Sequence, residues 1–205
     1  MDNLRSENYN DGNGIALVEN GANWYNTTLG ARCAYDNDDS NVSTFGMLYN
    51  GPAVATGMLC PSGWHVPSSD DLASLNAELG GVNVSGLALK SSQSDIPAWD
   101  GDNTSGFSAL PGGSRNQFGS FIGNALIGKW WTTTPNPTSA GYYLSFNLTT
   151  GYDYVTSSFS YEEYGNAIRC LKDAATASAP TVTTDAASDV AETGATLNGT
   201  VEGDG

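Results

Sequence analysis

The hydrophobic pattern of the chain indicates mostly short elements, and one stretch has the spacing of an amphipathic helix. Leu72, Leu75 and Leu79 recur at intervals of three and four residues, which places them on one face of a helix. Ser68 is a good N-cap, two aspartates fall in the positively polarised first turn, and Gly80 supplies a stop. The pattern predicts a helix between Ser68 and Gly80 whose leucines face a core.

Beyond this helix the pattern predicts one more short helix and otherwise favours strands. A second, shorter helix is predicted near Leu87–Ser91. Gly106–Thr133 joins two short apolar runs and the Trp130–Trp131 pair through several glycines, a mixture typical of short core strands connected by tight loops. This stretch is interpreted as scaffold that supports a functional surface elsewhere. Asn166–Leu171 is predicted to close the domain as its last strand.

The composition changes after Lys172, and three parts are expected: a domain over 1–173, a small-residue linker over 174–179 and a β segment over 180–205. In the last part, Thr181–Thr184 and Ala195–Val201 alternate as strands. Two strands cannot bury a core alone. The segment is therefore expected to be mobile, or to borrow an edge of its own domain or of a neighbouring chain, which would allow self-association.

The charge balance narrows the classes of partner. The chain carries 7 basic and 22 acidic residues, a net charge of −15, so it lacks the basic clusters that bind nucleic acid or anionic membrane. No apolar run has membrane-spanning length, so membrane insertion is not expected. Met1–Arg5 lacks the basic and apolar regions of a signal peptide. The chain is either intracellular or an internal piece of a longer protein, and we favour the second.

An acidic loop offers a weak candidate for a cation. Asp36, Asp38, Asp39 and Ser40 place carboxylate and hydroxyl oxygens close together, and calcium prefers such ligands. The loop lacks the glycine and the bidentate glutamate of an EF-hand. A solvated turn is therefore favoured, and no cofactor is expected, with calcium as the weak alternative.

The best candidate for a binding surface is the tyrosine-rich stretch Thr132–Tyr161. Its aromatic residues alternate with Ser, Thr, Asn and Gly, which is the chemistry of antibody-type binding surfaces. Ordinary strand content explains the same residues about as well, because Tyr, Phe and Thr favour strands. The residues predicted to contact a ligand are Tyr142, Tyr143, Phe146, Asn147, Tyr152, Asp153 and Tyr154.

Candidate catalytic residues are sparse. His65 is the single histidine, and its context favours a packed, hydrogen-bonded residue over a catalytic base. Glu162 and Glu163 are adjacent, so in a strand they point to opposite faces and cannot act as a facing carboxylate pair. Asp100 and Asp102 can share a face, but they lie in a glycine-rich turn without an identified partner. No enzymatic activity is expected.

A series of motifs in a fixed order carries a family resemblance. Together they resemble the Fibrobacter succinogenes major paralogous domain over about residues 1–173, and their joint occurrence is far more specific than any one alone. The motifs are Met1–Leu4, Tyr9–Gly12, Tyr35–Asp38, Phe45–Asn50, Leu59–Pro67, Gly106–Arg115, Trp130–Thr133 and Ile168–Cys170.

The resemblance implies a C-type-lectin-like fold of the α+β class, with two helices, small antiparallel sheets and long loops. Members occur in surface and secreted proteins of Bacteroidetes-like bacteria and are treated as extracellular, non-enzymatic modules. The same broad fold carries the hypervariable proteins of diversity-generating retroelements, whose variable region matches Thr132–Tyr161 by position. The segment over 180–205 looks like the start of a fibronectin type III-like repeat.

The three cysteines are far apart and fit no zinc-binding spacing. They allow one disulfide and one free thiol, or three reduced thiols in a cytosolic protein. Cys60 and Cys170 each adjoin an apolar segment, Val54–Leu59 and Ala167–Leu171, and these segments are expected to be neighbouring core strands. We therefore predict a Cys60–Cys170 disulfide, with Cys33 free.

Two functions fit these features. The first is an extracellular recognition or adhesion module that binds a glycan or a surface protein through the Tyr142–Tyr161 face. The second is a structural spacer or subunit of a bacterial surface or virion fibre, without a small ligand. The low charge, the glycine content and the following β segment fit the second equally well. The expected location is extracellular or cell-surface, with a virion as the alternative.

Overall fold

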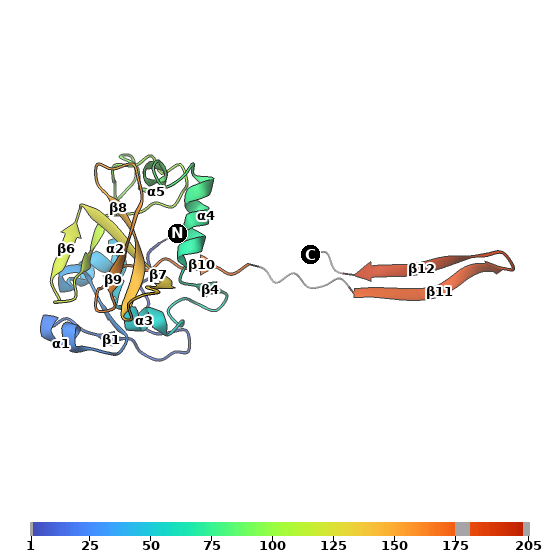
Figure 1. The fold of residues 1–205 in the computed structure, drawn as a ribbon, viewed down its shortest axis with the longest axis horizontal. Helices are drawn as coiled ribbons and strands as arrows, with labels where there is room; N and C mark the ends of the chain where they lie inside the picture. The colour runs from blue at the N-terminus through green and yellow to red at the C-terminus, as the bar shows by residue number, and fades with distance from the viewer. Residues whose placement is uncertain (1, 175–180, 203–205) are drawn as a thin grey trace. The chain divides into compact units, whose positions relative to one another are not determined.

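In the computed structural model, the chain forms two compact units, Met1–Lys172 and Asp173–Gly205. The structure describes residues 2–174 and 181–202. The first unit mixes helices with strands in several sheets, which is an α+β arrangement (Figure 1).

The main sheet of the first unit has five strands in the order β6-β5-β7-β8-β9. All neighbours are antiparallel except β5 and β7, which pair in parallel through Gly113 and Gly128. The short strands expected within the glycine-rich stretch 106–133 are present as β5, β6 and the first part of β7. The five strands are β5 (Gly112–Arg115), β6 (Phe121–Asn124), β7 (Ile127–Pro135), β8 (Tyr142–Thr149) and β9 (Thr156–Tyr161).

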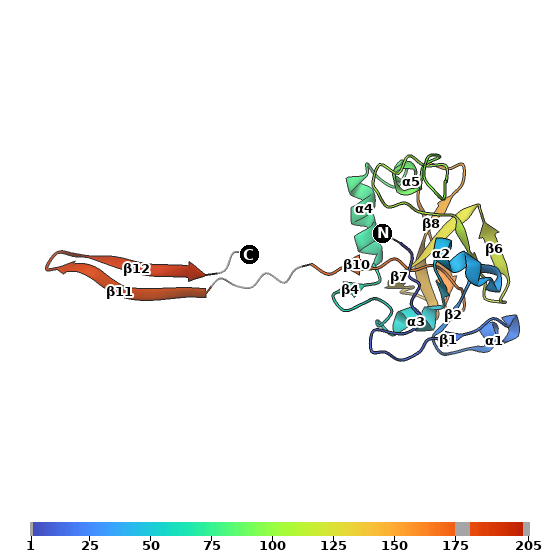
Figure 2. The same cartoon turned by 180° about the vertical axis from the view of Figure 1, so that it is seen from behind.

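Short helices and two small sheets surround the main sheet. The first small sheet joins β1 (Ala16–Leu17), β2 (Ala31–Cys33) and β3 (Leu48–Tyr49), and the second pairs β4 (Trp64–His65) with β10 (Leu171–Lys172). The view from behind brings α2 to the front (Figure 2). The helices are α1 (Gly21–Asn26), α2 (Val42–Phe45), α3 (Gly51–Ala55), α4 (Ser69–Glu78) and α5 (Ser85–Leu89), with 3-10 turns at Tyr35–Asn37 (η1) and Asp39–Asn41 (η2).

Helix α4 confirms the clearest prediction from the sequence. Ser68 caps it, and the side chain of Asp71 accepts a hydrogen bond from the Ser68 backbone N–H, which completes a capping box. Leu72, Leu75 and Leu79 are half-buried and pack against a core cluster that contains Trp130 and Phe146. The second predicted helix is present as α5, which begins two residues earlier than expected.

Strand β7 places two large rings on opposite sides of the sheet, because consecutive residues of a strand point to opposite faces. Trp130 packs in a core cluster with Phe146 and Leu148, whereas Trp131 packs in another with Tyr49 and Ile168. Both indoles are also hydrogen-bonded: Trp131 Nε1 donates to the Tyr49 carbonyl at 2.6 Å. The tryptophan pair therefore fixes the centre of the scaffold, as the sequence suggested.

The Cys60–Cys170 disulfide is present, and Cys33 is free and buried, so this prediction is confirmed. The prediction assumed that the segments beside the two cysteines are neighbouring strands, and this assumption was wrong. Val54–Leu59 is no strand, because Asn50 caps α3 and a proline in its first turn starts a helix there. Asn166–Leu171 is likewise no continuous strand: its first residues form isolated bridges, and β10 begins only at Leu171.

The second unit contains a β-hairpin of β11 (Thr181–Ala191) and β12 (Gly194–Glu202). Both predicted strands are present and longer than expected, and they pair with each other. One face carries Val182, Leu197 and Val201, which are 67–85% exposed. The other face carries polar side chains such as Thr183 and Thr200, whose hydroxyls lie 2.7 Å apart. The predicted linker at 174–179 lies almost wholly outside the described residues.

Candidate functional site

The structure separates the residues predicted to contact a ligand into two groups. Tyr142 and Tyr143 begin strand β8, whereas Tyr152, Asp153 and Tyr154 lie in the loop after its end. Seven residue steps along the strand separate the ends, which is roughly 23 Å at the rise of a β-strand. These residues therefore form two surfaces instead of one.

Two of the predicted residues lie inside the fold. Phe146 is 1% exposed, and its ring centroid lies 5.9 Å from that of Trp130. Asn147 is 9% exposed, and its Nδ2 donates a hydrogen bond to the Ser158 hydroxyl at 3.2 Å. Both residues stabilise the sheet and its core, so they are not on the surface where they were expected.

A group of rings lies at the start of β8 and the end of β9, two of them exposed and two half-buried, and we call it the aromatic surface. Tyr142 lies opposite Tyr161 in the β8–β9 ladder, and their ring centroids are 4.4 Å apart. Tyr161 also stacks on Tyr164 at 6.3 Å, with an interplanar angle of 10°. Phe159 and Tyr161 are 44% and 42% exposed. The aromatic surface consists of Tyr142, Phe159, Tyr161 and Tyr164.

The aromatic surface carries one nearby cation. The ammonium group of Lys129 lies 4.8 Å from the centroid of the Tyr164 ring, a cation–π distance. Burial lowers the pKa of Lys129 to about 8. The hydroxyl of Tyr142 interacts with that of Tyr161, which raises the pKa of Tyr142. At neutral pH the surface therefore offers the neutral hydroxyl of Tyr142 and the ammonium group of Lys129.

Tyr143 contributes to the interior. Its neighbours along β8 point to the other face, and its ring packs edge-on against Trp131 with centroids 6.2 Å apart. Of the predicted site, only Tyr142 belongs to the aromatic surface. The predicted contact residues did not include Phe159, Tyr161 or Tyr164. The sequence offered a signal for two of them, because the alternation within β9 places Phe159 and Tyr161 on one face.

The second group of rings lies in the β8–β9 loop. Tyr152 and Tyr154 are 48% and 40% exposed, with centroids 5.0 Å apart. A buried ion pair holds the loop: the Lys90 ammonium lies 2.8 Å from an Asp100 carboxylate oxygen and donates to the Tyr152 carbonyl at 2.9 Å. The backbone N–H of Gly151 donates to the other oxygen of Asp100. The Lys90–Asp100 ion pair and the hydrogen bonds to the loop backbone therefore hold Tyr152 and Tyr154 in position.

The acidic loop does not assemble a cation site. Asp38 uses its carboxylate to cap η2 by accepting from the Ser40 N–H at 2.9 Å. Hydrogen bonds from the Ser40 side chain and backbone lower the pKa of Asp38. Asp36 adopts a positive φ of 56° within a tight turn, and Asp39 begins η2. Among the described residues, no group of three acidic, histidine or cysteine side chains could hold a metal ion.

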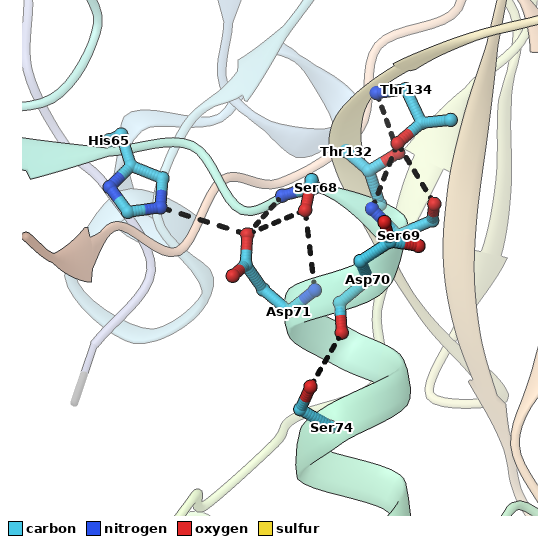
Figure 3. A network of polar contacts seen from close by, with 8 residues as sticks. All are labelled: His65, Ser68, Ser69, Asp70, Asp71, Ser74, Thr132 and Thr134. Carbon is cyan, nitrogen blue, oxygen red and sulfur yellow. Dashed lines mark hydrogen bonds and ion pairs between the residues drawn. The ribbon is translucent and has the colours of Figure 1, made fainter.

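A polar network at the start of α4 contains histidine, serine and aspartate, but their order is not that of a hydrolase triad (Figure 3). Ser68 Oγ donates a hydrogen bond to one carboxylate oxygen of Asp71 at 2.7 Å, and His65 Nε2 lies 3.7 Å from the same oxygen. In a triad the histidine lies between the serine and the carboxylate. Ser69 N–H donates to the Thr134 hydroxyl at 2.9 Å, so the network ties α4 to β7.

Residues from four separate sequence motifs meet in one buried cluster. Asn3 Oδ1 accepts hydrogen bonds from Trp130 Nε1 and Arg169 Nε, both at 2.8 Å. The Arg169 guanidinium also lies 4.1 Å from the Phe107 ring centroid, and burial lowers the pKa of Arg169 to about 10. The motifs recognised in the sequence therefore hold the scaffold together, while the aromatic surface lies outside them.

Comparison with known proteins identifies a family for the first unit. No curated protein and no solved structure matches the chain. No helix in the described part of the chain is long and apolar enough to cross a membrane. The sequence model of the Fibrobacter succinogenes major domain matches residues 1–172, as the resemblance implied, and the chain belongs to this family.

Proposed function

We propose that this chain is an extracellular, non-enzymatic recognition or adhesion module that binds a glycan or a surface protein through the aromatic surface. One observation carries the proposal. Tyr142, Phe159 and Tyr161 belong to none of the core clusters among the described residues, yet they lie together, with Phe159 and Tyr161 exposed and Tyr142 half-buried. Grouped rings that do not stabilise a core are typical of a binding surface.

The chemistry of the rings suits recognition. Tyrosine gives a large amphipathic contact at a low cost in conformational entropy, and its hydroxyl supplies a directional hydrogen bond. The Lys129 ammonium beside Tyr164 adds a donor at the edge of the surface. Residues of this kind dominate binding energy at interfaces, where truncation of a central tyrosine commonly costs 2 kcal/mol or more.

Two features support the location and the fold. A disulfide is typical of proteins in oxidising compartments, and Cys60–Cys170 supports an extracellular location. The mixture of short helices, small sheets and long loops supports a C-type-lectin-like fold, although the described part of the first unit has five α-helices where two were expected.

The proposal is tested by a binding screen with two proteins. The full chain and a variant with Tyr142, Phe159, Tyr161 and Tyr164 replaced by serine are applied to a glycan array and to immobilised bacterial surface proteins. The proposal expects a ligand that binds the full chain and loses at least tenfold in affinity with the variant. Equal binding by both proteins, with the variant still folded by circular dichroism, would refute it.

A structural role is the second candidate, and one observation favours it. The hairpin exposes Val182, Leu197 and Val201 on one face, and an isolated two-stranded hairpin with such a face is marginal in water. Burial of that face against another chain would suit a spacer or fibre subunit, including one of a virion. Sedimentation of the full chain at increasing concentration distinguishes the roles, because a fibre subunit self-associates and a monomeric recognition module does not.

A further inference from the structure

Strand β9 is an open edge of the main sheet. The order of the strands ends at β9, and in the described part of the chain this strand pairs only with β8. Five of its six residues are exposed. The outer side of such a strand carries backbone N–H and C=O groups that can pair with a strand of another chain.

The hydrogen bonds at the end of β9 show which of its backbone groups point outward. Along an antiparallel strand, successive residues turn these groups alternately toward the paired strand and away from it. The Glu162 N–H donates to the Gly141 carbonyl at 2.8 Å, immediately beyond the β8–β9 ladder. Every second residue before Glu162 therefore turns toward β8. The remaining residues, Ser157, Phe159 and Tyr161, turn outward.

Two of these outward residues have no backbone partner on that side. The Tyr161 carbonyl accepts a hydrogen bond from the Tyr164 N–H at 2.9 Å, which agrees with its outward direction. The outward N–H and C=O groups of Ser157 and Phe159 are bonded to no described residue. These four groups are therefore free to bond another strand in place of water.

Strand β9 also lacks the features by which natural proteins block such pairing. A charge, a proline or a bulge usually protects an edge, but β9 reads Thr-Ser-Ser-Phe-Ser-Tyr and keeps a continuous register with β8. The opposite edge, β6, has only four residues, and Gly123 interrupts it with a φ of 76°. Strand β11 of the second unit carries two aspartates and register shifts.

The charge and the sequence of β9 favour a second copy of this chain as its partner. Two chains of net charge −15 repel each other, so they can meet only where charge is missing, as it is along β9. Antiparallel pairing centred on Phe159 would place this ring opposite Phe159 of the second copy, and aromatic cross-strand pairs are favourable. Ser157 would face Tyr161. Glu162 would face Thr156 of the second copy, so no acidic residue would oppose another.

We infer that two copies of this chain associate by antiparallel pairing of β9 with β9 about a two-fold axis at Phe159. The outward groups of Ser157 and Phe159 then bond across the axis, and the sheets join into one of ten strands, five from each copy. The two aromatic surfaces meet at this edge, because Phe159 and Tyr161 belong to both. Each copy uses the same edge, so association stops at two copies, whereas a fibre subunit continues to add copies.

The experiment combines sedimentation and amide hydrogen exchange of the full chain from micromolar to millimolar concentration. The mass is expected to rise from 21.3 kDa toward twice that value and no further. In the same range, exchange of the Ser157 and Phe159 N–H groups is expected to become about tenfold slower once the dimer dominates. The N–H groups of Ser158 and Ser160, which face β8 in both states, are the internal control and keep their rates.

A substitution of Ser157 separates backbone pairing from side-chain contact. Ser157→Pro removes one outward N–H, and proline is tolerated at an edge where that group faces solvent. It is expected to weaken the dimer at least about tenfold, with unchanged tryptophan fluorescence, because proline cannot donate across the axis. Ser157→Ala keeps the N–H and is the matched control, which dimerises like the wild type. If Ser157→Pro does not fold, the hydrogen exchange decides the question.

Several results would overturn the inference: a single copy at every concentration, growth beyond two copies, or Ser157 and Phe159 exchange that does not depend on concentration. A dimer unaffected by Ser157→Pro would do the same. If association persists in Ser157→Pro but is lost in Leu197→Ser/Val201→Ser, the contact belongs to the hairpin and β9 is not the interface. The measurements need no ligand, so their failure would leave the proposed function untouched.

Discussion

Replacement of Lys90 by methionine tests how the β8–β9 loop is held. Lys90 is fully buried, lies 2.8 Å from Asp100, and donates to the carbonyl of Tyr152. Its ammonium also lies 5.5 Å from the Trp99 ring centroid. Lys90→Met fills most of the same volume but leaves the Asp100 carboxylate and the Tyr152 carbonyl without their cation.

The expected loss follows from the cost of breaking a buried ion pair on one side, about 3–5 kcal/mol. For a domain of this size, 1 kcal/mol shifts the melting temperature by about 2–4 °C, so the expected decrease is roughly 6–20 °C. Urea unfolding followed by tryptophan fluorescence measures it, because every tryptophan of the chain lies in the first unit. The matched control is Lys172→Met on the exposed strand β10, which stays within about 0.5 kcal/mol of the wild type.

A double-mutant cycle completes the test. Asp100→Asn alone leaves Lys90 buried and unpaired, so it is also expected to destabilise. The double variant removes both charges and is expected to be more stable than the sum of the single losses by at least about 1 kcal/mol. Additive losses, or a Lys90→Met variant within about 1 kcal/mol of the wild type, would show that the ion pair does not anchor the loop.

Further predictions concern the disulfide, the free thiol and helix α4. Replacement of Cys60 and Cys170 by alanine is expected to cost about 4–5 kcal/mol in urea unfolding, because the bridge closes a long loop; a loss under about 1 kcal/mol would contradict this. Burial raises the pKa of Cys33 to about 11, so a thiol reagent at pH 8 detects no thiol in the native protein and one after unfolding. Hydrogen bonds from Ser68 lower the pKa of Asp71. The contribution of the ionised Asp71 carboxylate to stability is therefore present above the ordinary aspartate pKa near 4 and is lost as the pH falls further. The stability of Asp71→Asn, measured by acid unfolding, should therefore depend less on pH than that of the wild type.

Helix α4 could be predicted because its signals are local. Ser68, the first-turn aspartates and the leucine spacing all lie within one short stretch and agree with one another. Helix α3 had similar signals in Asn50 and Pro52, which mark a helix start. The apolar run that follows them was nevertheless interpreted as a strand. That error came from weighing hydrophobicity above capping.

The candidate site could not be derived from the sequence, because it depends on strand register and on which side chains the rest of the fold buries. Tyr142 and Phe146 share a face of β8, yet the core around α4 covers Phe146 and leaves Tyr142 only half-buried. Tyr161 reaches Tyr142 only because β9 pairs with β8 in this register, and a slip of one residue would turn Tyr161 to the other face. Neither fact has a local signal.

The ion pair below the second tyrosine group shows the same limit. Lys90 and Asp100 are ten residues apart, and the sequence gives no sign that the lysine is fully buried. Lysine is rarely buried unless it is paired. Its burial results from the packing of the Trp99 ring and the β8–β9 loop around it, which only the folded chain shows.

The central claim is that recognition occurs at the aromatic surface, and a matched pair of double variants tests it most directly. Tyr142→Ala/Tyr161→Ala and Tyr152→Ala/Tyr154→Ala remove the same atoms from two pairs of neighbouring tyrosines at opposite ends of β8. Calorimetry with the ligand found in the binding screen compares their affinities. We predict at least a tenfold loss for the first variant and less than a twofold loss for the second, with both folded. A larger loss for Tyr152→Ala/Tyr154→Ala would contradict the account and place recognition at the β8–β9 loop.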